Sequence, residues 1–232
     1  MIQKTGTIKG FLLANKPEGM TSFSVVKKVR SITQVKKVGH AGTLDPFATG
    51  LLVLALDRSY TSRLQEVVNT EKTYEVEVLF GVETNTLDCD GEVVKTMAGR
   101  LDRSQLESVI DQFHGTQLQT PPAFSAKKIN GVRAYHLARK NQEVCLEPVE
   151  ITISKIELLA FHSNFQSTAT LRVVCSKGTY VRQLVSDIAR ACNTVAHAKR
   201  LVRTQIGHYM LKDALPYEAL SREAIQAAIL NA

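Results

Sequence analysis

One acidic side chain, Asp45, lies inside a glycine-rich segment that spans residues 39–52. The glycines of this segment are Gly39, Gly42 and Gly50. They allow positive φ angles and close approach of the backbone, while Pro46 restricts the residue before it to extended or turn geometry. Because an apolar run at 51–56 follows, we predict that the carboxylate is presented on a turn beside a hydrophobic strand. Taken by itself, the Asp-Pro dipeptide is best explained as an ordinary turn. The neighbouring His40 and the glycines favour a functional site.

The balance of charge points to a polyanionic partner. The 232 residues include 29 lysines and arginines and 22 acids, a formal net charge of +7, and the sequence pI is about 9.3. Three stretches concentrate the basic side chains: residues 27–37, 127–140 and 172–203. The first two contain no acid, and the third has seven basic residues and one acid, Asp187. A charged run is usually a solvated surface, but three such clusters favour nucleic acid as the partner.

The sequence lacks the usual signals of several classes of protein and of binding site. The first residues contain no apolar segment of a secretory signal, and no apolar run approaches the ~20 residues of a membrane span. The four cysteines are widely separated, without C-x-x-C or histidines at the spacing of a metal site. The phosphate-binding motifs G-x-x-x-x-G-K-[ST] and G-x-G-x-x-G are missing too. We therefore expect a cytoplasmic protein with free thiols, no membrane segment, no metal and no cofactor.

Hydrophobic periodicity predicts an irregular alternation of helices and strands. Ser22 is the expected N-cap of a first helix, whose apolar positions recur at Val25, Val26, Val29 and Ile32. Residues 73–80 alternate as a strand with Tyr74 on its apolar face, and a capping box at 104–107 is expected to start another helix. A strand at 172–176 leads to a helix that begins near Val181. This order predicts an α+β fold with a mostly antiparallel sheet.

Turn residues delimit an excursion from the core at about 121–144. Pro121-Pro122 and Asn130-Gly131 bracket the second basic cluster. Tyr135 and His136 lie among its five basic residues, a mixture that suits contact with an RNA backbone together with base stacking. We therefore predict a clamp that closes over an RNA loop.

Five segments of the chain together resemble the TruB family of bacterial tRNA pseudouridine-55 synthases. These segments are residues 10–22, 39–52, 72–74, 175–182 and 198–203. They occur in the family's order and spread from Gly10 to about Gly207, so the set is far more specific than any single motif. One departure is Asn15, where the family more often has an Asp.

The resemblance implies the pseudouridine synthase fold, a central, mostly antiparallel mixed β-sheet flanked by helices. It implies a single catalytic domain over residues 1–232, with the clamp inserted at about 121–144. Family members usually continue into a small C-terminal RNA-binding module of the PUA type. We do not expect that module here, because the sequence ends after a last helical stretch at 221–230. The expected partner is the T-stem-loop of tRNA, and the expected state is a monomer.

The resemblance also assigns catalytic roles to three residues. Asp45 matches the essential acid of the family, Tyr74 matches a tyrosine that stacks on the uracil, and Arg182 matches the arginine that pairs with the acid. Core packing is the other interpretation of Tyr74. Arg182 is expected at a helix start, where the helix dipole slightly disfavours a cation. A buried carboxylate such as Asp45 would compensate for that position.

Five further residues are assigned by the resemblance to substrate binding: His40, Tyr180, Leu201, Lys16 and Lys177. His40 matches a histidine that contacts the flipped RNA, while Tyr180 and Leu201 would line the uracil pocket. Lys16 and Lys177 would contact phosphate or steady the site, although a solvated lysine is an equally good explanation.

The implied reaction converts one T-loop uridine, at tRNA position 55, to pseudouridine. The bond from N1 to C1′ breaks, the base turns, and C5 joins C1′, without any exchange of atoms or electrons with a cofactor. A hydrolytic glycosidase generally needs two carboxyl groups, whereas one can be enough when the uracil stays bound. Asp45 could attack the sugar or remove a proton from it, and the sequence leaves both paths open.

Two other functions fit part of the sequence. A non-catalytic tRNA-binding or RNA-folding protein explains the charge and the clamp but leaves the Asp45 turn unused. A phosphotransferase with an Asp nucleophile requires Mg²⁺ and further acids near Asp45, where the sequence offers Asp57 alone.

Overall fold

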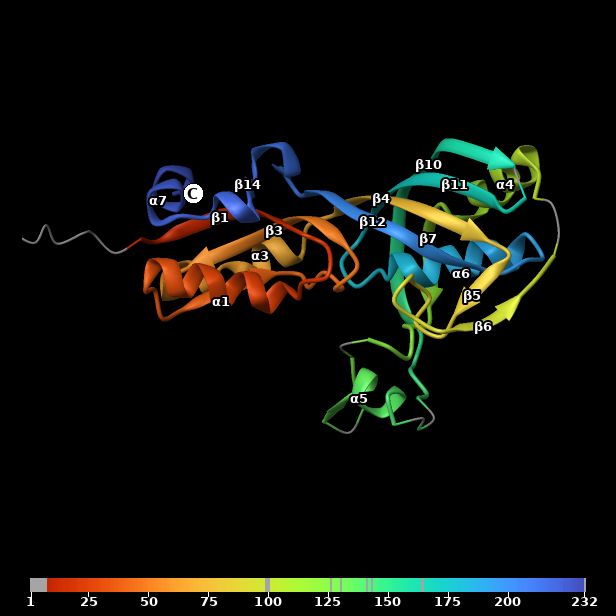
Figure 1. Cartoon of the computed structure of the whole chain (residues 1–232), viewed down its shortest axis with the longest axis horizontal. Helices are drawn as coiled ribbons and strands as arrows, with labels where there is room; N and C mark the ends of the chain where they lie inside the picture. Colours follow the sequence, from red (N-terminus) through yellow and green to blue (C-terminus); the bar gives the residue numbers. More distant parts are fainter. Residues whose placement is uncertain are drawn as a thin grey trace, which may run out of the picture. The chain divides into compact units, whose positions relative to one another are not determined.

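The computed structural model describes residues 8–98, 101–125, 127–129, 131–140, 142, 144–163 and 165–231, without the side chains of Lys128 and Arg133. The chain divides into two compact units. Unit 1 comprises Met1–Thr73 and Val202–Ala232, and unit 2 comprises Tyr74–Leu201. The chain passes between the units within two strands, β4 (Lys72–Phe80) and β12 (Ala196–Ile206) (Figure 1). The expected single catalytic domain, built from both units, stays a prediction.

Unit 1 contains a mixed sheet around the apolar strand β3. Its strands are β1 (Gly10–Lys16), β2 (Val38–Ala41), β3 (Thr49–Leu56), the end of β12, β13 (Tyr209–Met210) and β14 (Leu215–Pro216). Within the unit their order is β14-β1-β3-β12, with β2 on β3 and β13 on β12. Strands β1 and β2 run antiparallel to β3, whereas β14 is parallel to β1 and β12 is parallel to β3.

Strand β3 serves two cores, one on each face. The helices of unit 1 are α1 (Ser22–Thr33), α2 (Arg58–Thr61), α3 (Leu64–Val68) and α7 (Arg222–Ala228). The even-numbered leucines at 52–56 pack with α1, and the odd-numbered residues at 51–55 pack with Phe11, Leu13 and α3. Successive strand residues point to opposite faces, so a strand that is apolar at every position is buried on both sides. The strand that follows the Asp45 turn is therefore anchored along its length.

Helix α1 begins one residue earlier than the sequence predicts. Thr21 is the N-cap, and its hydroxyl accepts a hydrogen bond from the Ser24 amide at 3.1 Å. Ser22, the predicted cap, is instead the first helical residue, and its buried hydroxyl accepts from the Leu44 amide at 2.9 Å. The predicted inward face is confirmed by the burial of Val25, Val26 and Val29 and by the packing of Ile32 on the same core.

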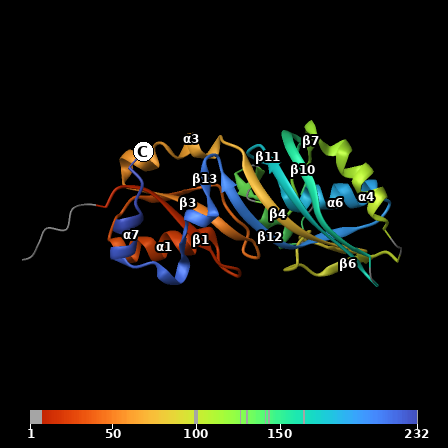
Figure 2. The same cartoon turned by 90° about the horizontal axis from the view of Figure 1, so that it is seen from above.

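Unit 2 contains a second group of paired strands with helices packed against it. The main strands are β4, the start of β12, β7 (Gly115–Gln119), β10 (Val149–Ser163) and β11 (Ser167–Cys175), in the order β12-β4-β11-β10-β7. Strand β10 runs antiparallel to both β11 and β7. Helix α4 (Arg103–Ile110), followed by a 3-10 turn (Asp111–Phe113), contacts β10 and helix α6 (Val181–Ala191) (Figure 2). A small ribbon of β5 (Val82–Thr84) and β6 (Val93–Thr96) lies outside this sheet.

The predicted α+β class and the predominance of antiparallel pairing are confirmed. The alternating strand at 73–80 corresponds to β4, in which Val76, Val78 and Phe80 are buried. The capping box predicted at 104–107 is wrong, because α4 starts at Arg103 after the N-cap Asp102. The Glu107 carboxylate accepts from the Arg103 side chain at 2.7 Å, one helical turn away.

The predicted excursion lies between β7 and β10 of unit 2 (Figure 1). It carries β8 (Lys128–Ile129), β9 (Val132–Arg133) and α5 (Ala134–Ala138). Local hydrogen bonds support it, from the Ala134 amide to the Lys127 carbonyl at 2.7 Å and from the Tyr135 amide to the Ser125 carbonyl at 3.1 Å. Its action as a clamp stays a prediction. Among the residues that the structure describes, no helix is long and apolar enough to cross a bilayer.

Candidate active site

The Asp45 turn connects β2 to β3 in unit 1. The Ala48 amide donates to the Asp45 carbonyl at 3.2 Å, the hydrogen bond of a four-residue turn. Leu44 and Phe47 are buried on either side, while Asp45 itself is half-buried. The turn is thus held by two buried apolar side chains, and the acid is left partly accessible.

A buried lysine at the end of β1 holds this turn through hydrogen bonds to backbone carbonyl groups. Lys16 is fully buried, and its Nζ donates to the carbonyls of Pro17, Met20 and Pro46 at 2.8, 2.6 and 3.1 Å. The Gly19 amide also donates to the Pro46 carbonyl, at 2.9 Å. An ammonium group has three donors, and a buried charge needs such partners. Lys16 therefore steadies the turn, and its contact with substrate stays a prediction.

A second buried cation, Arg203 on β12, links the two flanks of the turn. Its Nε donates to the Leu51 carbonyl at 2.8 Å and its Nη2 donates to the Gly42 carbonyl at 3.1 Å. Gly50 pairs with Arg203 in the sheet at a φ of +105°, and a Cβ there would lie 2.4 Å from the Arg203 carbonyl oxygen. Only glycine allows this approach of β12 to β3. The sequence places Arg203 in a cluster for nucleic acid, but its guanidinium is buried against carbonyls.

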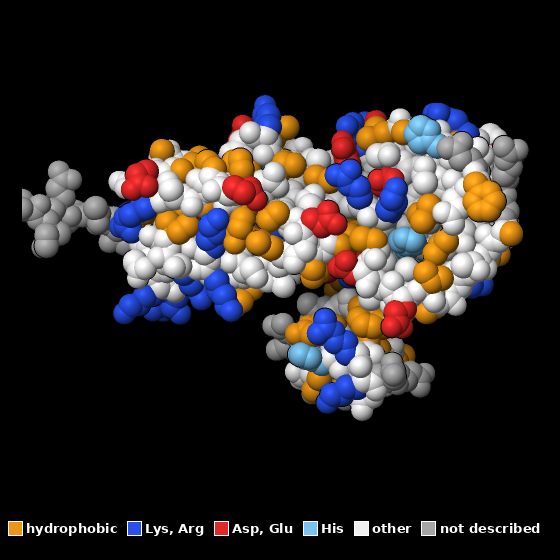
Figure 3. All heavy atoms as spheres, in the orientation of Figure 1, with side chains coloured by type: hydrophobic (Ala, Val, Ile, Leu, Met, Phe, Trp, Pro, Cys, Tyr) orange, Lys and Arg blue, Asp and Glu red, His pale blue; other side chains and the backbone are white. Residues whose placement is uncertain are grey.

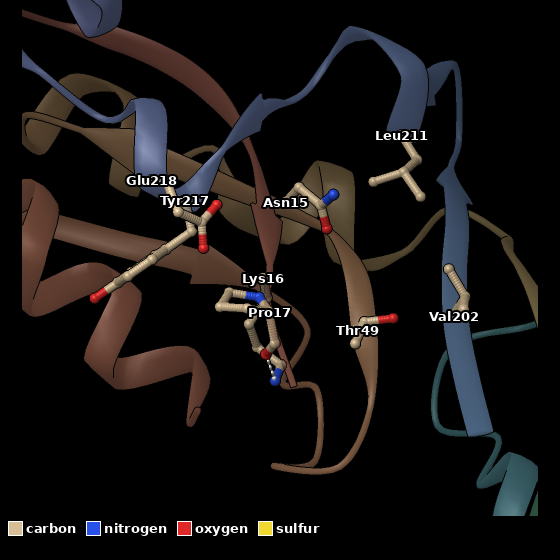
Figure 4. A pocket seen from close by; sticks show the side chains of 8 residues that line it. All are labelled: Asn15, Lys16, Pro17, Thr49, Val202, Leu211, Tyr217 and Glu218. Atoms are coloured by element: carbon tan, nitrogen blue, oxygen red, sulfur yellow. Dashed lines mark hydrogen bonds between the residues drawn. The ribbon is translucent and has the colours of Figure 1, made fainter. Parts of the chain in front are cut away.

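A cavity of about 220 Å³ lies beside the end of β1 (Figure 4). Its lining residues are Asn15, Lys16, Pro17, Thr49, Val202, Leu211, Tyr217 and Glu218. Figure 4 shows the Lys16 ammonium directed to the Pro17 carbonyl, the hydrogen bond described above. Asp45 is not among the residues that line this cavity.

His40 lies on β2, close to the same arginine. Burial lowers the pKa of His40 below its usual value, the charge of Arg203 lowers it further, and a backbone interaction with Gly42 opposes both effects. The imidazole is therefore neutral at pH 7 and brings no positive charge to a phosphate. A neutral imidazole still offers one donor, one acceptor and a flat ring to an RNA base. This is compatible with the predicted contact to substrate.

In unit 2, Arg182 near the start of α6 has a buried carboxylate partner that the sequence does not single out. Its Nη1 lies 3.2 Å from Asp88 Oδ2, and the two side chains are 3% and 7% exposed. Its guanidinium also donates to the carbonyl oxygens of Thr86 and Phe124. Asp88 in turn accepts from the Thr86 hydroxyl at 2.6 Å and from the Asp90 amide at 3.1 Å. The cation near this helix start is thus compensated by the buried Asp88, and the predicted pairing of Arg182 with Asp45 stays a prediction.

The buried side chain of Gln119 on β7 holds Tyr180 at the N-cap of α6. Its Oε1 accepts from the Tyr180 amide at 2.8 Å, and its Nε2 donates to the Tyr180 carbonyl at 3.1 Å. A glutamine amide can make this pair of hydrogen bonds because it carries both a donor and an acceptor. Gln119 therefore fixes the backbone of a predicted pocket residue from 61 positions away, a contact that no local pattern reveals.

The remaining predicted residues of unit 2 differ in exposure. Tyr74 is half-buried on β4, beside Glu75, which accepts from Arg172 at 2.8 Å. Leu201 is buried on β12, whereas Lys177 is exposed in the turn between β11 and α6. Core packing and pocket lining are both compatible with Tyr74 and Leu201.

The predicted site residues are thus shared between the units. Unit 1 carries Lys16, His40 and Asp45, and unit 2 carries Tyr74, Lys177, Tyr180, Arg182 and Leu201. In the excursion of unit 2, the rings of Tyr135 and His136 lie 4.1 Å apart, and the Arg139 guanidinium lies 5.7 Å from the centre of the Tyr135 ring. Two of its five predicted basic side chains, those of Lys128 and Arg133, lie outside the described part of the structure. No cluster of three His, Cys, Asp or Glu side chains suited to a metal ion occurs among the described residues.

The family match decides between the predicted classes of protein. Residues 30–181 match the family described as TruB family pseudouridylate synthase (N terminal domain). The chain belongs to this family. It is therefore an enzyme of the isomerase class, and the predicted resemblance is confirmed.

Curated relatives extend the match over nearly the whole chain. The tRNA pseudouridine synthase B of Aquifex aeolicus is 43% identical over 90% of this chain and 72% of its own length. The proteins of the same name from Solibacter usitatus and Desulfotalea psychrophila are 43% and 44% identical, over 96% and 89% of this chain and 75% and 85% of their own lengths.

Solved structures show the same fold at lower identity. A chain of a Cbf5-Nop10-Gar1 complex superposes with a TM-score of 0.73 at 24% identity, over 95% of this chain and 59% of that chain. A chain of an H/ACA RNP bound to a substrate RNA gives a TM-score of 0.67 at 23% identity, over 91% and 52%. This chain thus spans somewhat more than half of each of those chains. The predicted pseudouridine synthase fold is confirmed.

Proposed function

We propose that this protein is a tRNA pseudouridine synthase that isomerises the T-loop uridine at tRNA position 55, with the Asp45 carboxylate as the essential group. The observation that carries the proposal is the Asp45 turn within a member of the TruB family. Relatives named tRNA pseudouridine synthase B, 43% to 44% identical over about nine tenths of the chain, support tRNA as the substrate.

The architecture of the turn supports a catalytic role for Asp45. A reacting carboxylate must be held in a productive geometry before the substrate arrives, because misplacement by about 1 Å can cost 100-fold in rate. Lys16 and Arg203 supply that fixation from both flanks through carbonyl groups. Asp45 itself is partly accessible, as a group that meets a flipped uridine has to be.

The reaction requires no group beyond the protein and the RNA. Asp45 attacks C1′ or removes a proton from the sugar, the N1–C1′ bond breaks, and the retained uracil re-attaches through C5. The hydrogen on C5 then leaves and N1 takes up a proton, so atoms balance and no electrons are transferred. Tyr74 stacks on the uracil and relays the C5 proton, and Arg182 orients the Asp45 carboxylate.

The proposed substrate residues act on a uridine that has left its stack. Extrusion of a base costs a few kcal/mol, which phosphate contacts and stacking in the pocket offset. We assign His40 to contact with the flipped RNA, Tyr180 and Leu201 to the uracil pocket, and Lys16 and Lys177 to steadying the site or contacting phosphate. The excursion at 121–144 closes over the T-loop.

The test is chemical mapping of pseudouridine on an unmodified tRNA transcript incubated with the pure protein in EDTA. We expect modification at position 55 alone, with EDTA present. Asp45→Asn should abolish product while RNA affinity changes by no more than a few-fold. The matched control is Asp57→Asn, the same change at an acid that caps α2 through the Ser59 amide at 3.1 Å.

The outcomes separate the alternatives. Product formation by Asp45→Asn near the wild-type rate would refute the catalytic assignment. Tight tRNA binding without any product in the wild-type protein would favour the non-catalytic RNA-binding protein.

A further inference from the structure

The outer face of α1 carries an exposed stripe that starts beside the Asp45 turn. Ser22, in the first turn of the helix, shares two hydrogen bonds with Leu44, the residue before Asp45. The exposed residues that follow are Phe23, Lys27, Ser31 and Gln34, at the three- and four-residue spacing of one helix face. Lys36 and Lys37, also exposed, come directly after. Twelve helical residues span about 18 Å, so the stripe leads away from the turn by roughly that distance.

Several other cations of the basic clusters are engaged within the protein. In unit 1, Lys28 Nζ donates to the Tyr217 carbonyl at 2.8 Å and lies 3.8 Å from the centre of its ring, and Arg30 donates to the Val38 carbonyl at 2.8 Å. In unit 2, three cations of the 172–203 cluster face acids: Arg172 with Glu75, Arg190 with Glu83, and Lys199 with Glu77. Phosphate would have to compete with these internal partners.

Lys27, Lys36 and Lys37 are in a different situation. They are exposed, and the sequence from 22 to 37 contains no acid. Figure 3 shows Lys and Arg side chains gathered along the lower edge of unit 1, where Figure 1 draws α1, and no Asp or Glu is seen among them along that edge. Such an acid-free surface attracts a polyanion.

Phe23 adds an aromatic ring to the start of the stripe. It is 51% exposed, an unusual position for a large apolar side chain, and the Lys27 Nζ lies 5.2 Å from the ring centre. Proteins that follow single-stranded nucleic acid combine basic side chains along the backbone with aromatic rings on which bases stack. The pair of Phe23 and Lys27 has both elements, near the end of α1 that is hydrogen-bonded to Leu44 through Ser22.

We propose that Phe23, Lys27, Lys36 and Lys37, here called the α1 track, bind the sugar-phosphate backbone of the substrate RNA beyond the nucleotide on which Asp45 acts. This inference rests on the proposed function and names the part of the protein that holds the flanking RNA. The track contributes affinity, and it takes no part in the bond-breaking step.

The test removes three charges from the track in Lys27→Ala/Lys36→Ala/Lys37→Ala and measures affinity for an unmodified tRNA transcript across a salt series. Each phosphate contact adds roughly 0.7 to 0.9 to the slope of log affinity against log salt, so the slope should fall by about 2 to 3. Raising the salt from about 50 to about 200 mM should therefore weaken the wild-type protein roughly 20- to 40-fold more than the triple variant. The single-turnover rate at saturating RNA should stay within about two-fold.

The matched control removes three exposed lysines from other elements, in Lys95→Ala/Lys155→Ala/Lys212→Ala. This control lowers the net charge by the same amount as the α1 variant. If the track is specific, the slope of log affinity against log salt should change by less than about 1 in the control. Phe23→Ala should weaken binding at least about five-fold without changing the slope, since stacking is uncharged. Phe165→Ala, which truncates a fully exposed phenylalanine of unit 2, should bind as the wild type does.

The results distinguish this inference from the proposed function. An unchanged slope in the α1 triple variant, or an equal loss in the control triple variant, overturns the track and leaves the reaction untouched. A loss of the saturating rate would show that the lysines support chemistry, which also contradicts the inference. Absence of product with the wild-type protein is a failure of the proposed function instead, and the binding titrations detect the track independently of it.

Discussion

Arg203→Met tests whether one buried side chain sets the geometry of the Asp45 turn. The arginine is 1% exposed, and it spans from the Gly42 carbonyl before the turn to the Leu51 carbonyl after it. Methionine keeps an unbranched apolar stem in the same place but has no donor. The substitution therefore isolates the two hydrogen bonds from most of the packing.

The expected cost follows from those two carbonyls. A buried acceptor left without its partner costs about 1–3 kcal/mol, so two of them cost roughly 2–6 kcal/mol. Removal of a buried guanidinium returns part of its desolvation penalty. We expect the free energy of unfolding to fall by about 2–4 kcal/mol, a large part of the roughly 5–15 kcal/mol of a typical domain. A turn that can shift should also lower the rate about 10- to 100-fold.

Urea denaturation gives the stability change, and single-turnover pseudouridine formation at saturating tRNA gives the rate. Arg222→Met is the matched control: its guanidinium also donates to a carbonyl of unit 1, that of Thr33 at 2.8 Å, outside the turn. Arg203→Lys serves if the methionine variant does not fold, since it keeps the charge and should show a smaller loss in both measurements. An Arg203→Met protein with a stability loss below about 1 kcal/mol and the wild-type rate would refute this account of the turn.

Three further predictions follow from the same contacts. Arg182→Lys should lose turnover and stability although the charge is kept, because one ammonium cannot replace guanidinium nitrogens that reach Asp88 and two carbonyls; wild-type kinetics would contradict this. Since the folded-state pKa of His40 lies below 6.5, the unfolded state binds more protons, and stability should fall as the pH drops through about 6.5. Urea midpoints from pH 8 to 5 should show this loss in the wild type and less of it in His40→Gln. Gly50→Ala should destabilise the protein by about 2 kcal/mol or more, because its φ is +105° and the new Cβ would meet the Arg203 backbone; a smaller change in the urea titration would show that β3 can move away.

Local patterns in the sequence determined the elements around the candidate site. The spacing of Val25, Val26 and Val29 defines the buried face of α1, and the alternation from 73 to 80 defines β4. These predictions hold because burial of apolar side chains follows the period of the element itself, whatever it packs against. The motif around Asp45, together with the other four motif segments in their order along the chain, was likewise sufficient to predict the family.

The partners of polar side chains were decided by tertiary structure. Ser22 was free to cap α1 by its sequence, but folding brings Leu44 to its hydroxyl and Thr21 takes the cap. In the sequence, Arg203 is one more member of a basic cluster. In the folded chain, β12 places its Nε 2.8 Å from the carbonyl oxygen of Leu51, 152 positions away. In the sequence, Asp88 is one of several acids between 71 and 92, and only the folded structure shows that it pairs with Arg182.

The physical reason is the range over which each signal acts. Hydrophobic burial is non-directional and proportional to area, so it can be read from a residue's own type and spacing. A hydrogen bond or a buried ion pair depends on distances of about 3 Å between groups that lie far apart in the chain. The sequence by itself therefore determined the main elements around the candidate site and the family, and only the tertiary structure decided which cations are buried at the Asp45 turn and which stay exposed.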